Sequence, residues 1–303
     1  MEPSRPTLAA VVREQLGLSW EKARERCRRG QVTVDGEVVV DPAFRVPEGA
    51  EVKVEESRPR IRQGHLDPSR ILFYDRDVVV VDKPAGVLTM PYAEGDRDTL
   101  VDMTRATLRK LDKGFDPDLG VVQRLDKGTS GVLVFPRSLA AKRSLEQQLR
   151  ARTVERRYFA IVNGEARDAR HESYLVPNRG DGLRGSHGVF RRAKGGPGPE
   201  ARYALTEVRV VERLRGATLV ECKLGTGRQH QIRIHLAEDG NPLVGENVYV
   251  RDVEGPLLEA PRPMLHAARL GFEHPRKETW MEFESPLPED FQATYRALRG
   301  GRR

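Results

Sequence analysis

The sequence predicts an α+β protein with a small N-terminal unit and a larger unit built around one sheet. At 303 residues the chain is longer than an average domain, so a small module beside a larger one is the natural division. The first 57 residues read as two helices and a hairpin. In the remainder, strand-like runs outnumber helical ones.

The N-terminal unit, residues 1–57, is defined by its helix and turn signals. TLAAVVREQLGL has the apolar spacing of a helix. Ser19 is a typical N-cap for a second helix, SWEKARERCRRG, and Gly30 can end that helix in a left-handed conformation. VTVDGEVVV then carries two β-rich arms around Asp-Gly, the strongest short signal for a hairpin.

Positive charge is concentrated on the second of these helices. Lys22, Arg24, Arg28 and Arg29 fall within eight residues, and Arg24 and Arg28 lie one turn apart on the same face. Residues 1–57 as a whole have nine Lys or Arg against eleven Asp or Glu, so this charge is local. A basic helix face usually serves only solvation, but such a concentration also fits a phosphate-binding surface.

Residues 58–70 lack hydrophobic periodicity and form the predicted linker, which leaves residues 71–303 to the larger unit. Its expected strands include DVVVVDKP, GVLVF, YFAIVNG, TLVECKL and QIRIHL, and its expected helices lie around 97–112 and 138–151. Residues 178–202 are rich in Gly, Pro and Arg and are predicted to be a long mobile loop. Such a loop can order on binding RNA or be a tolerated surface insertion.

Composition indicates the kind of partner. The formal charge of +7 and the pI near 9.5 favour a polyanion as partner, and Arg suits bidentate phosphate contacts, although genomic bias can also enrich Arg.

No apolar run is long enough for a membrane span and no secretory signal opens the chain, so we expect a cytoplasmic protein. Cys27 and Cys222 suggest no disulfide framework, and the seven His do not cluster, so we expect no metal.

The stretch VVQRLDKGTSG, residues 121–131, places Asp126 in a turn between two segments that look buried. An Asp beside Gly and Ser most often closes the turn by accepting backbone N–H bonds. A turn between buried segments can equally hold a carboxylate in fixed geometry for chemistry.

Two further stretches carry candidate residues. In GTGRQHQIRIHL, residues 225–236, apolar and polar residues alternate from Gln231 to Leu236, which predicts a strand with Arg233 on the face away from the core. In ERRYFAIVNG, residues 155–164, Tyr158 shares a strand face with Ala160 and Val162. A strand Tyr is ordinarily core packing, with its hydroxyl finding a partner.

Taken together, RLDKGTSG, RRYFAIVNG and TGRQHQIRIHLA resemble the motifs of the RluA family of pseudouridine synthases, which isomerise specific uridines in RNA. VDKPAGVLTMP, GNPLVGENVY and LHAARLGFEHP support the likeness, which covers residues 70–292 in the family's order. The resemblance implies a mixed, largely antiparallel central sheet and no cofactor. Residues 7–55 similarly resemble an S4 RNA-binding domain, whose second helix carries the basic RNA face.

The resemblance also implies roles for individual residues. Asp126 is the expected catalytic carboxylate, Tyr158 the aromatic against the flipped uracil and Arg233 the basic partner of the Asp. Arg124 is expected to help displace the target base, and Gln123 stands where the family commonly has His. The S4-like helix is expected to bind RNA through Lys22, Arg24, Arg28 and Arg29.

These motifs leave some alternatives open. Asp126 can act as nucleophile or as base, and the chain can instead be a non-catalytic RNA-binding or ribosome-assembly factor. A DNA-binding regulator is disfavoured because no helix-turn-helix or zinc signature is present. Among substrates, large-subunit ribosomal RNA is favoured and transfer RNA comes second, and a monomer is expected.

Overall fold

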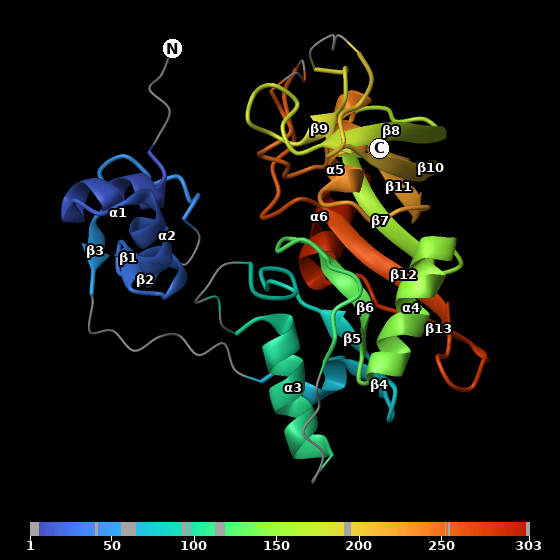
Figure 1. Ribbon diagram of the computed structural model, residues 1–303. Helices are drawn as coiled ribbons and strands as arrows, with labels where there is room; N and C mark the ends of the chain where they lie inside the picture. Colours follow the sequence, from blue (N-terminus) through green and yellow to red (C-terminus); the bar gives the residue numbers. More distant parts are fainter. Residues whose placement is uncertain are drawn as a thin grey trace. The chain divides into compact units, whose positions relative to one another are not determined.

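The computed structural model describes residues 6–39, 42–55, 65–92, 96, 98–112, 119–190, 195–251, 253 and 255–300, apart from two side chains, Arg28 and Val38. The chain divides into two compact units, residues 1–64 and 65–303 (Figure 1). The predicted linker lies outside the described residues up to position 64, and Pro68–Arg70 form a short 3₁₀ turn, η1.

Both predicted helices of the N-terminal unit are present. α1 spans Leu8–Leu16 and α2 spans Trp20–Arg28. The Ser19 hydroxyl accepts the N–H of Lys22, as expected for an N-cap. Beyond α2, Gly30 has a φ of 70°, which supplies the left-handed turn that ends the helix.

The predicted hairpin is also present, and a third strand joins it. β1 (Val32–Val34) and β2 (Glu37–Val38) pair antiparallel around Asp35 and Gly36, whose φ angles of 50° and 84° match the requirement of a type I′ turn. β3 (Val52–Val54) pairs with the other side of β1. The helices close one core with this sheet through Leu8, Val12, Ala23, Cys27 and Val32.

A ten-stranded sheet forms the centre of the C-terminal unit. Its strands follow the order β4-β5-β6-β12-β7-β11-β10-β8-β9, and β13 also pairs with β12. Every pair is antiparallel except β6 with β12. The expected mixed, largely antiparallel sheet is therefore confirmed. Its strands are β4 (Ile71–Tyr74), β5 (Val78–Lys83), β6 (Ser130–Pro136), β7 (Glu155–Asn163), β8 (Ala169–Val176), β9 (Gly185–Ser186), β10 (Arg202–Leu214), β11 (Ala217–Leu224), β12 (Leu265–Glu273) and β13 (Trp280–Glu284).

Helices pack on both faces of the β5–β6 end of the sheet. α3 (Leu100–Leu111) shares a buried cluster with Val79, and α4 (Leu139–Ala151) shares another with Val80. Because neighbouring strand residues point to opposite faces, a strand covered on both sides reads as a continuous apolar run.

No helix in the described part of the chain has the length and apolar character needed to cross a membrane. The last helix, α6, spans Glu289–Arg299.

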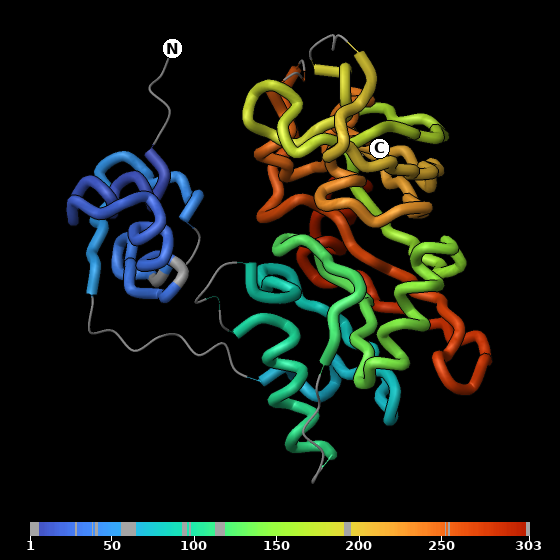
Figure 2. Tube along the Cα trace, in the orientation of Figure 1, coloured from blue at the N-terminus to red at the C-terminus, as the bar shows by residue number. Residues whose placement is uncertain are grey.

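Segments distant in sequence meet at the middle of the sheet. Figures 1 and 2 show β12, near the end of the chain, running between β6 and β7. Gly131, in β6, makes this meeting possible: it has a φ of 115°, and a Cβ added there would lie 2.2 Å from the carbonyl oxygen of Ala267. The Asp126 motif therefore ends in a glycine that lets two strands approach closely.

The strand predicted for QIRIHL is wrong, because these residues form a helix, α5 (Gln231–Glu238). Ile232 and Leu236, one helical turn apart, pack into the largest core, whereas Ile234 packs into a separate cluster. All residues from 231 to 236 are buried. A helix buried all round has no polar face, so its 3.6-residue period was hidden and the chance alternation suggested a strand.

Residues 178–202, predicted to be a long mobile loop, contain a short strand in their described part. β9 lies within this segment and pairs with β8, and Arg179 forms a buried ion pair with Asp181. Positions 191–194 lie outside the described residues.

Candidate active site

The backbone around Asp126 is fixed by buried hydrogen bonds. The Lys83 ammonium is fully buried and donates to the carbonyl oxygens of Asp126 at 3.1 Å, Lys127 at 3.2 Å and Thr129 at 2.7 Å, and also to Pro84 at 3.2 Å. Burial lowers the pKa of Lys83 to about 7, although the negative charge of Asp126 acts in the opposite direction. One side chain from β5 thus holds the loop that precedes β6.

The predicted turn is present, but the Asp126 carboxylate does not close it. The backbone carbonyl of Asp126 accepts the N–H of Thr129 at 3.0 Å, and no described residue donates a hydrogen bond to the side chain. Thr89 fixes the other side of the turn, because its hydroxyl donates to the Leu125 carbonyl at 2.8 Å and accepts the Leu125 N–H at 3.1 Å. The carboxylate is consequently held in place by its backbone and remains open to a ligand.

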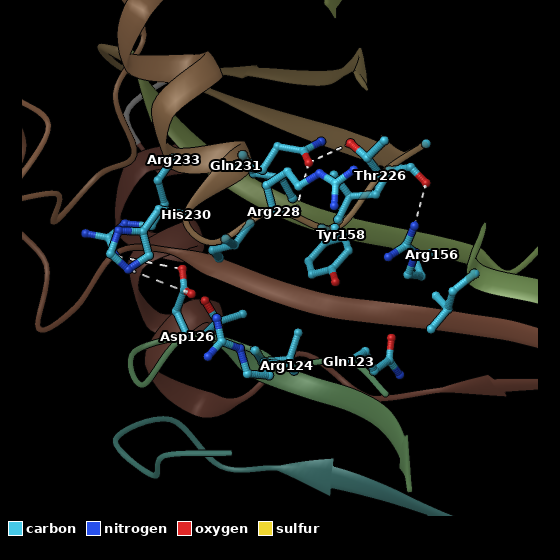
Figure 3. A pocket seen from close by; sticks show the side chains of 18 of the residues that line it. Gln123, Arg124, Asp126, Arg156, Tyr158, Thr226, Arg228, His230, Gln231 and Arg233 are labelled. Carbon is cyan, nitrogen blue, oxygen red and sulfur yellow. Dashed lines mark hydrogen bonds and ion pairs between the residues drawn. The ribbon is translucent and has the colours of Figure 1, made fainter. Parts of the chain in front are cut away.

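Arg233 of α5 and His230, the N-cap residue of that helix, lie just beyond hydrogen-bond distance of this carboxylate (Figure 3). Arg233 NH1 is 3.8 Å from Oδ2, and His230 Nε2 is 3.9 Å from Oδ1. The Asp126 side chain is 23% exposed, so it reaches solvent while facing both groups.

The nearest partner of Arg233 is Glu246. Arg233 Nε and NH2 donate to the two Glu246 oxygens at 2.8 and 2.6 Å, and the Glu246 side chain is 0% exposed. Glu246 also accepts backbone N–H bonds from residues 247–249. Burial alone would raise the pKa of Glu246, but the hydrogen bond and charge of Arg233 lower it overall. Likewise, burial opposes ionisation of Arg233, yet Glu246 and then Asp126 raise its pKa, so both groups stay charged.

His230 and Tyr249 complete this cluster. His230 Nδ1 lies 2.7 Å from the Tyr249 hydroxyl. Burial lowers the pKa of His230, although Asp126 acts in the opposite direction, so the imidazole is neutral at pH 7. Burial raises the pKa of Tyr249 to about 12. His230 also has a left-handed φ of 59° at the start of α5, a strained conformation that is common at functional sites.

Tyr158 projects from β7 toward the same cavity (Figure 3). Its ring is buried with Ala160 and Val162, as the predicted strand face requires. The expected partner for its hydroxyl is absent among the described residues. Burial raises the pKa of Tyr158 to about 12, so the hydroxyl is a neutral donor. A buried ring with an unpartnered hydroxyl at a cavity is suited to contact a ligand.

Asp126 lines two adjoining hollows. One, of about 380 Å³, is lined by Tyr158 and several arginines, and the other, of about 480 Å³, is lined by residues 88–90 and Tyr92. Asp126, Arg124 and Gln123 line both. Arg124 is exposed, whereas the Gln123 side-chain nitrogen is buried without a hydrogen-bond partner in the described part of the chain. The structure therefore gathers the predicted residues Arg124, Asp126, Tyr158 and Arg233 around one cavity.

Sequence reasoning missed Glu246, His230 and Tyr249 as members of the site. All three fall in segments that carry the family likeness, TGRQHQIRIHLA and GNPLVGENVY. Their contribution depends on contacts between α5 and the following loop, which no local pattern shows.

The predicted RNA-binding residues of α2 belong to the other unit. Arg24 lies over the exposed ring of Trp20 at 5.7 Å, and Arg13 lies over it at 4.7 Å. Lys22 is exposed, and Arg29 is ion-paired with Glu25. The Arg28 side chain lies outside the described residues.

One cluster has metal-ligand character, formed by Asp75, Asp77 and His274. Side chains of the protein already contact its carboxylates. His274 Nε2 lies 2.9 Å and Lys277 Nζ 3.3 Å from Asp75 Oδ2, while Arg276 NH2 lies 2.7 Å from Asp77 Oδ1. These contacts form a polar network that joins the β4–β5 turn to the β12–β13 turn.

Comparison with known proteins identifies the class. The family model for RNA pseudouridylate synthase matches residues 77–238, and the S4 domain model matches residues 8–52. The chain belongs to the RNA pseudouridylate synthase family and carries an S4 domain at its N-terminal side.

Relatives of this chain match most of its length. It is 37% identical over 290 residues to the ribosomal large subunit pseudouridine synthase D of Pseudomonas aeruginosa, covering 90% of this chain and 85% of that protein. It is 36% identical over 278 residues to the uncharacterized RNA pseudouridine synthase YlyB of Bacillus subtilis, covering 89% and 86%. The fold is similar to human RNA pseudouridylate synthase domain containing 4, with a TM-score of 0.61 and 23% identity over 76% of this chain and 93% of that one.

Proposed function

We propose that this RNA pseudouridylate synthase converts specific uridines of large-subunit ribosomal RNA to pseudouridine, with Asp126 as the catalytic carboxylate. The observation that carries the proposal is the Asp126 side chain, which is held by its backbone, accepts no hydrogen bond from the described residues and lines two adjoining hollows. A non-catalytic RNA-binding protein has no need of a carboxylate presented in this way.

A uridine in folded RNA must leave its stack before a protein carboxylate can reach its glycosidic bond. Tyr158 offers a buried ring and a free hydroxyl against the flipped base. Arg124 is exposed at the rim of both hollows, where it can occupy the space that the base leaves. These positions support the roles that the family likeness implies.

In the reaction the bond from C1′ to N1 breaks, a bond from C1′ to C5 forms, the proton on C5 is lost and N1 gains a proton. Asp126 can begin this by attacking the sugar or the uracil, in which case its covalent bond to the substrate breaks again before the product leaves. Alternatively, Asp126 can begin by removing a proton, which it then returns to the substrate. Arg233 NH1 faces the Asp126 carboxylate from 3.8 Å, and two direct hydrogen bonds to Glu246 hold the guanidinium back from closer contact. The carboxylate therefore remains available to the substrate.

The S4 domain is proposed to add affinity for RNA through Lys22, Arg24, Arg28 and Arg29. The exposed Trp20 ring, with the guanidinium groups of Arg13 and Arg24 close to it, combines an aromatic surface with positive charge. Arg24→Glu combined with Arg28→Glu is expected to weaken RNA binding and flatten its salt dependence. Lys53→Glu, on the same domain but already paired with Glu51, is the matched control. Equal binding by both variants would remove this role from α2.

The preference for large-subunit ribosomal RNA over transfer RNA rests on the S4 domain and on the names of the relatives. We further propose a monomer that acts on RNA rather than DNA, in the cytoplasm.

The test is to incubate ribosomal and transfer RNA from cells lacking this gene with the purified protein, and to map pseudouridine by carbodiimide-dependent stops in primer extension. New stops in large-subunit ribosomal RNA support the proposal. Stops confined to transfer RNA contradict the proposed substrate, and no stop in either RNA despite tight binding favours a non-catalytic RNA-binding protein.

A further inference from the structure

Arg156 is a buried cation without an anionic partner. It lies two residues before Tyr158 on the same face of β7, lines the same hollow, and is only 6% exposed. Its one hydrogen bond is long, from NH2 to the Leu224 carbonyl at 3.4 Å, and its Nε is buried without any partner in the described part of the chain. No described carboxylate lies within ion-pair distance. Burying a guanidinium without an anionic partner costs free energy, so an anionic ligand is expected to bind beside it.

Two exposed arginines lie beside the same end of the hollow. Arg228 Nε donates to the Tyr203 carbonyl at 3.0 Å, and the Arg152 guanidinium lies 5.1 Å from the centre of the Tyr203 ring. Neither is ion-paired among the described residues, and the nearby Glu172 is already engaged by the Tyr203 hydroxyl at 2.6 Å. Burial first, and then the charges of Arg202 and Arg152, lower the pKa of Arg228. Like charges therefore lie close together, and no described carboxylate is within ion-pair distance of either arginine.

The backbone at Arg152 is strained. This residue ends α4 in a left-handed conformation with a φ of 60°, a position where Gly is usual. A side chain kept at such a position is a common sign that the side chain itself has a function.

The loop after β11 is shaped around the buried guanidinium. A Cβ added to Gly227 would lie 2.6 Å from Arg156 NH1, so only a glycine leaves that group where it is. Figure 3 shows Tyr158 between Asp126 and Arg156, with Arg228 above the ring. The hollow thus has Asp126 at one end and Arg156 at the other, with Arg228 above the ring between them.

We propose that Arg152, Arg156 and Arg228 form a phosphate subsite, which binds an RNA phosphodiester beside the flipped uridine. The inference rests on the proposed function and extends it by locating the backbone of the substrate on the side of Tyr158 away from Asp126. Arginine suits this ligand because its planar fork matches two phosphate oxygens. Arg150 also lines the hollow but is set apart by its contact with Glu146 at 3.9 Å.

The first test measures the affinity of the full chain for a fluorescein-labelled hairpin from large-subunit ribosomal RNA over a salt series. Arg228→Gln is expected to weaken binding about tenfold and to reduce the slope of log Kd against log salt by about 0.7 to 0.9, as for one lost phosphate contact. Arg296→Gln, which removes an exposed arginine paired with Glu289 outside the hollow, is the matched control and should leave the slope unchanged. Equal slopes for the two variants overturn the subsite.

Arg152→Gly separates function from folding. This change removes a charge and relieves the left-handed strain, so RNA affinity should fall while the midpoint of thermal unfolding stays level or rises by about 2 °C. A lower midpoint together with unchanged affinity would show that Arg152 is only structural. Gly227→Ala provides a readout of Arg156 without removing it, because it displaces the guanidinium and should weaken RNA binding in the same way.

The second test uses the modified site once it is mapped. A short RNA containing that uridine is prepared with a neutral methylphosphonate at each neighbouring linkage in turn. At one linkage the substitution should lower kcat/KM for the unmutated protein about tenfold but cause no further loss in Arg228→Gln. Additive losses at every linkage overturn the subsite while leaving the activity intact. If the protein forms no pseudouridine but the salt slopes differ as expected, the proposed function fails and the phosphate subsite stands.

Discussion

Glu246→Ala should destabilise the C-terminal unit and inactivate it through one residue, Arg233. The Glu246 side chain is 0% exposed and receives two guanidinium hydrogen bonds of 2.6 and 2.8 Å. Removing one partner of a buried ion pair typically costs about 3–5 kcal/mol, because the other charge stays buried. We expect a loss of about 4 kcal/mol in unfolding free energy. Activity should fall at least about 100-fold, since the released Arg233 can close the 3.8 Å gap to Asp126 and occupy it.

A second substitution tests this reasoning. Arg233→Leu in the Glu246→Ala background removes the uncompensated charge, and should restore about 2 kcal/mol of stability without restoring activity. The chain has two Trp, one in each unit, so a Trp20→Phe background makes Trp280 the sole fluorescent reporter of the C-terminal unit during urea unfolding. A cost below about 1 kcal/mol for Glu246→Ala, or additive losses in the double variant, would refute the account of this pair.

Three further predictions concern the scaffold. Lys83→Met should lower activity at least about tenfold while RNA affinity is retained, because the loop that carries Asp126 loses its buried hydrogen-bond donor. A fall in RNA affinity without a fall in activity would contradict this. Gly131→Ala should lower the free energy of unfolding, measured in urea, by more than about 4 kcal/mol, because the added Cβ would collide with the Ala267 carbonyl. A variant as stable as the unmutated protein would contradict the close approach of β6 and β12. Burial, and then His171, lower the pKa of His235 to about 4. Between pH 6.5 and 4 the unfolded chain therefore binds a proton that the folded chain does not, so stability should fall by about 3 kcal/mol as the pH drops, and His235→Gln should flatten that profile.

Local signals in the sequence predicted local structure well. Ser19 caps α2, Asp35 and Gly36 form the hairpin turn, and the unbroken apolar run of β5 marks a strand buried on both faces. Each depends on the chemistry of a few neighbouring residues, which the sequence displays directly.

The rest depended on tertiary contacts. Residues 231–236 were predicted as a strand because their polar members alternate with apolar ones, yet Gln231 is buried in a helix and donates to the Leu205 carbonyl at 2.9 Å. Arg233 was expected to pair with Asp126, but its closest partner is Glu246, thirteen residues further along the chain. Neither contact leaves a periodic trace in the sequence.

The central claim is that the Asp126 carboxylate performs the chemistry. Its most direct test compares pseudouridine formation and RNA affinity for the unmutated protein, Asp126→Asn and Asp239→Asn on the mapped RNA. Asp239 ends α5 and is 43% exposed, so it controls for loss of one carboxylate. We predict that Asp126→Asn binds RNA within about threefold of the unmutated protein and forms no product, whereas Asp239→Asn remains active. Product formation by Asp126→Asn at the rate of the unmutated protein would contradict the account.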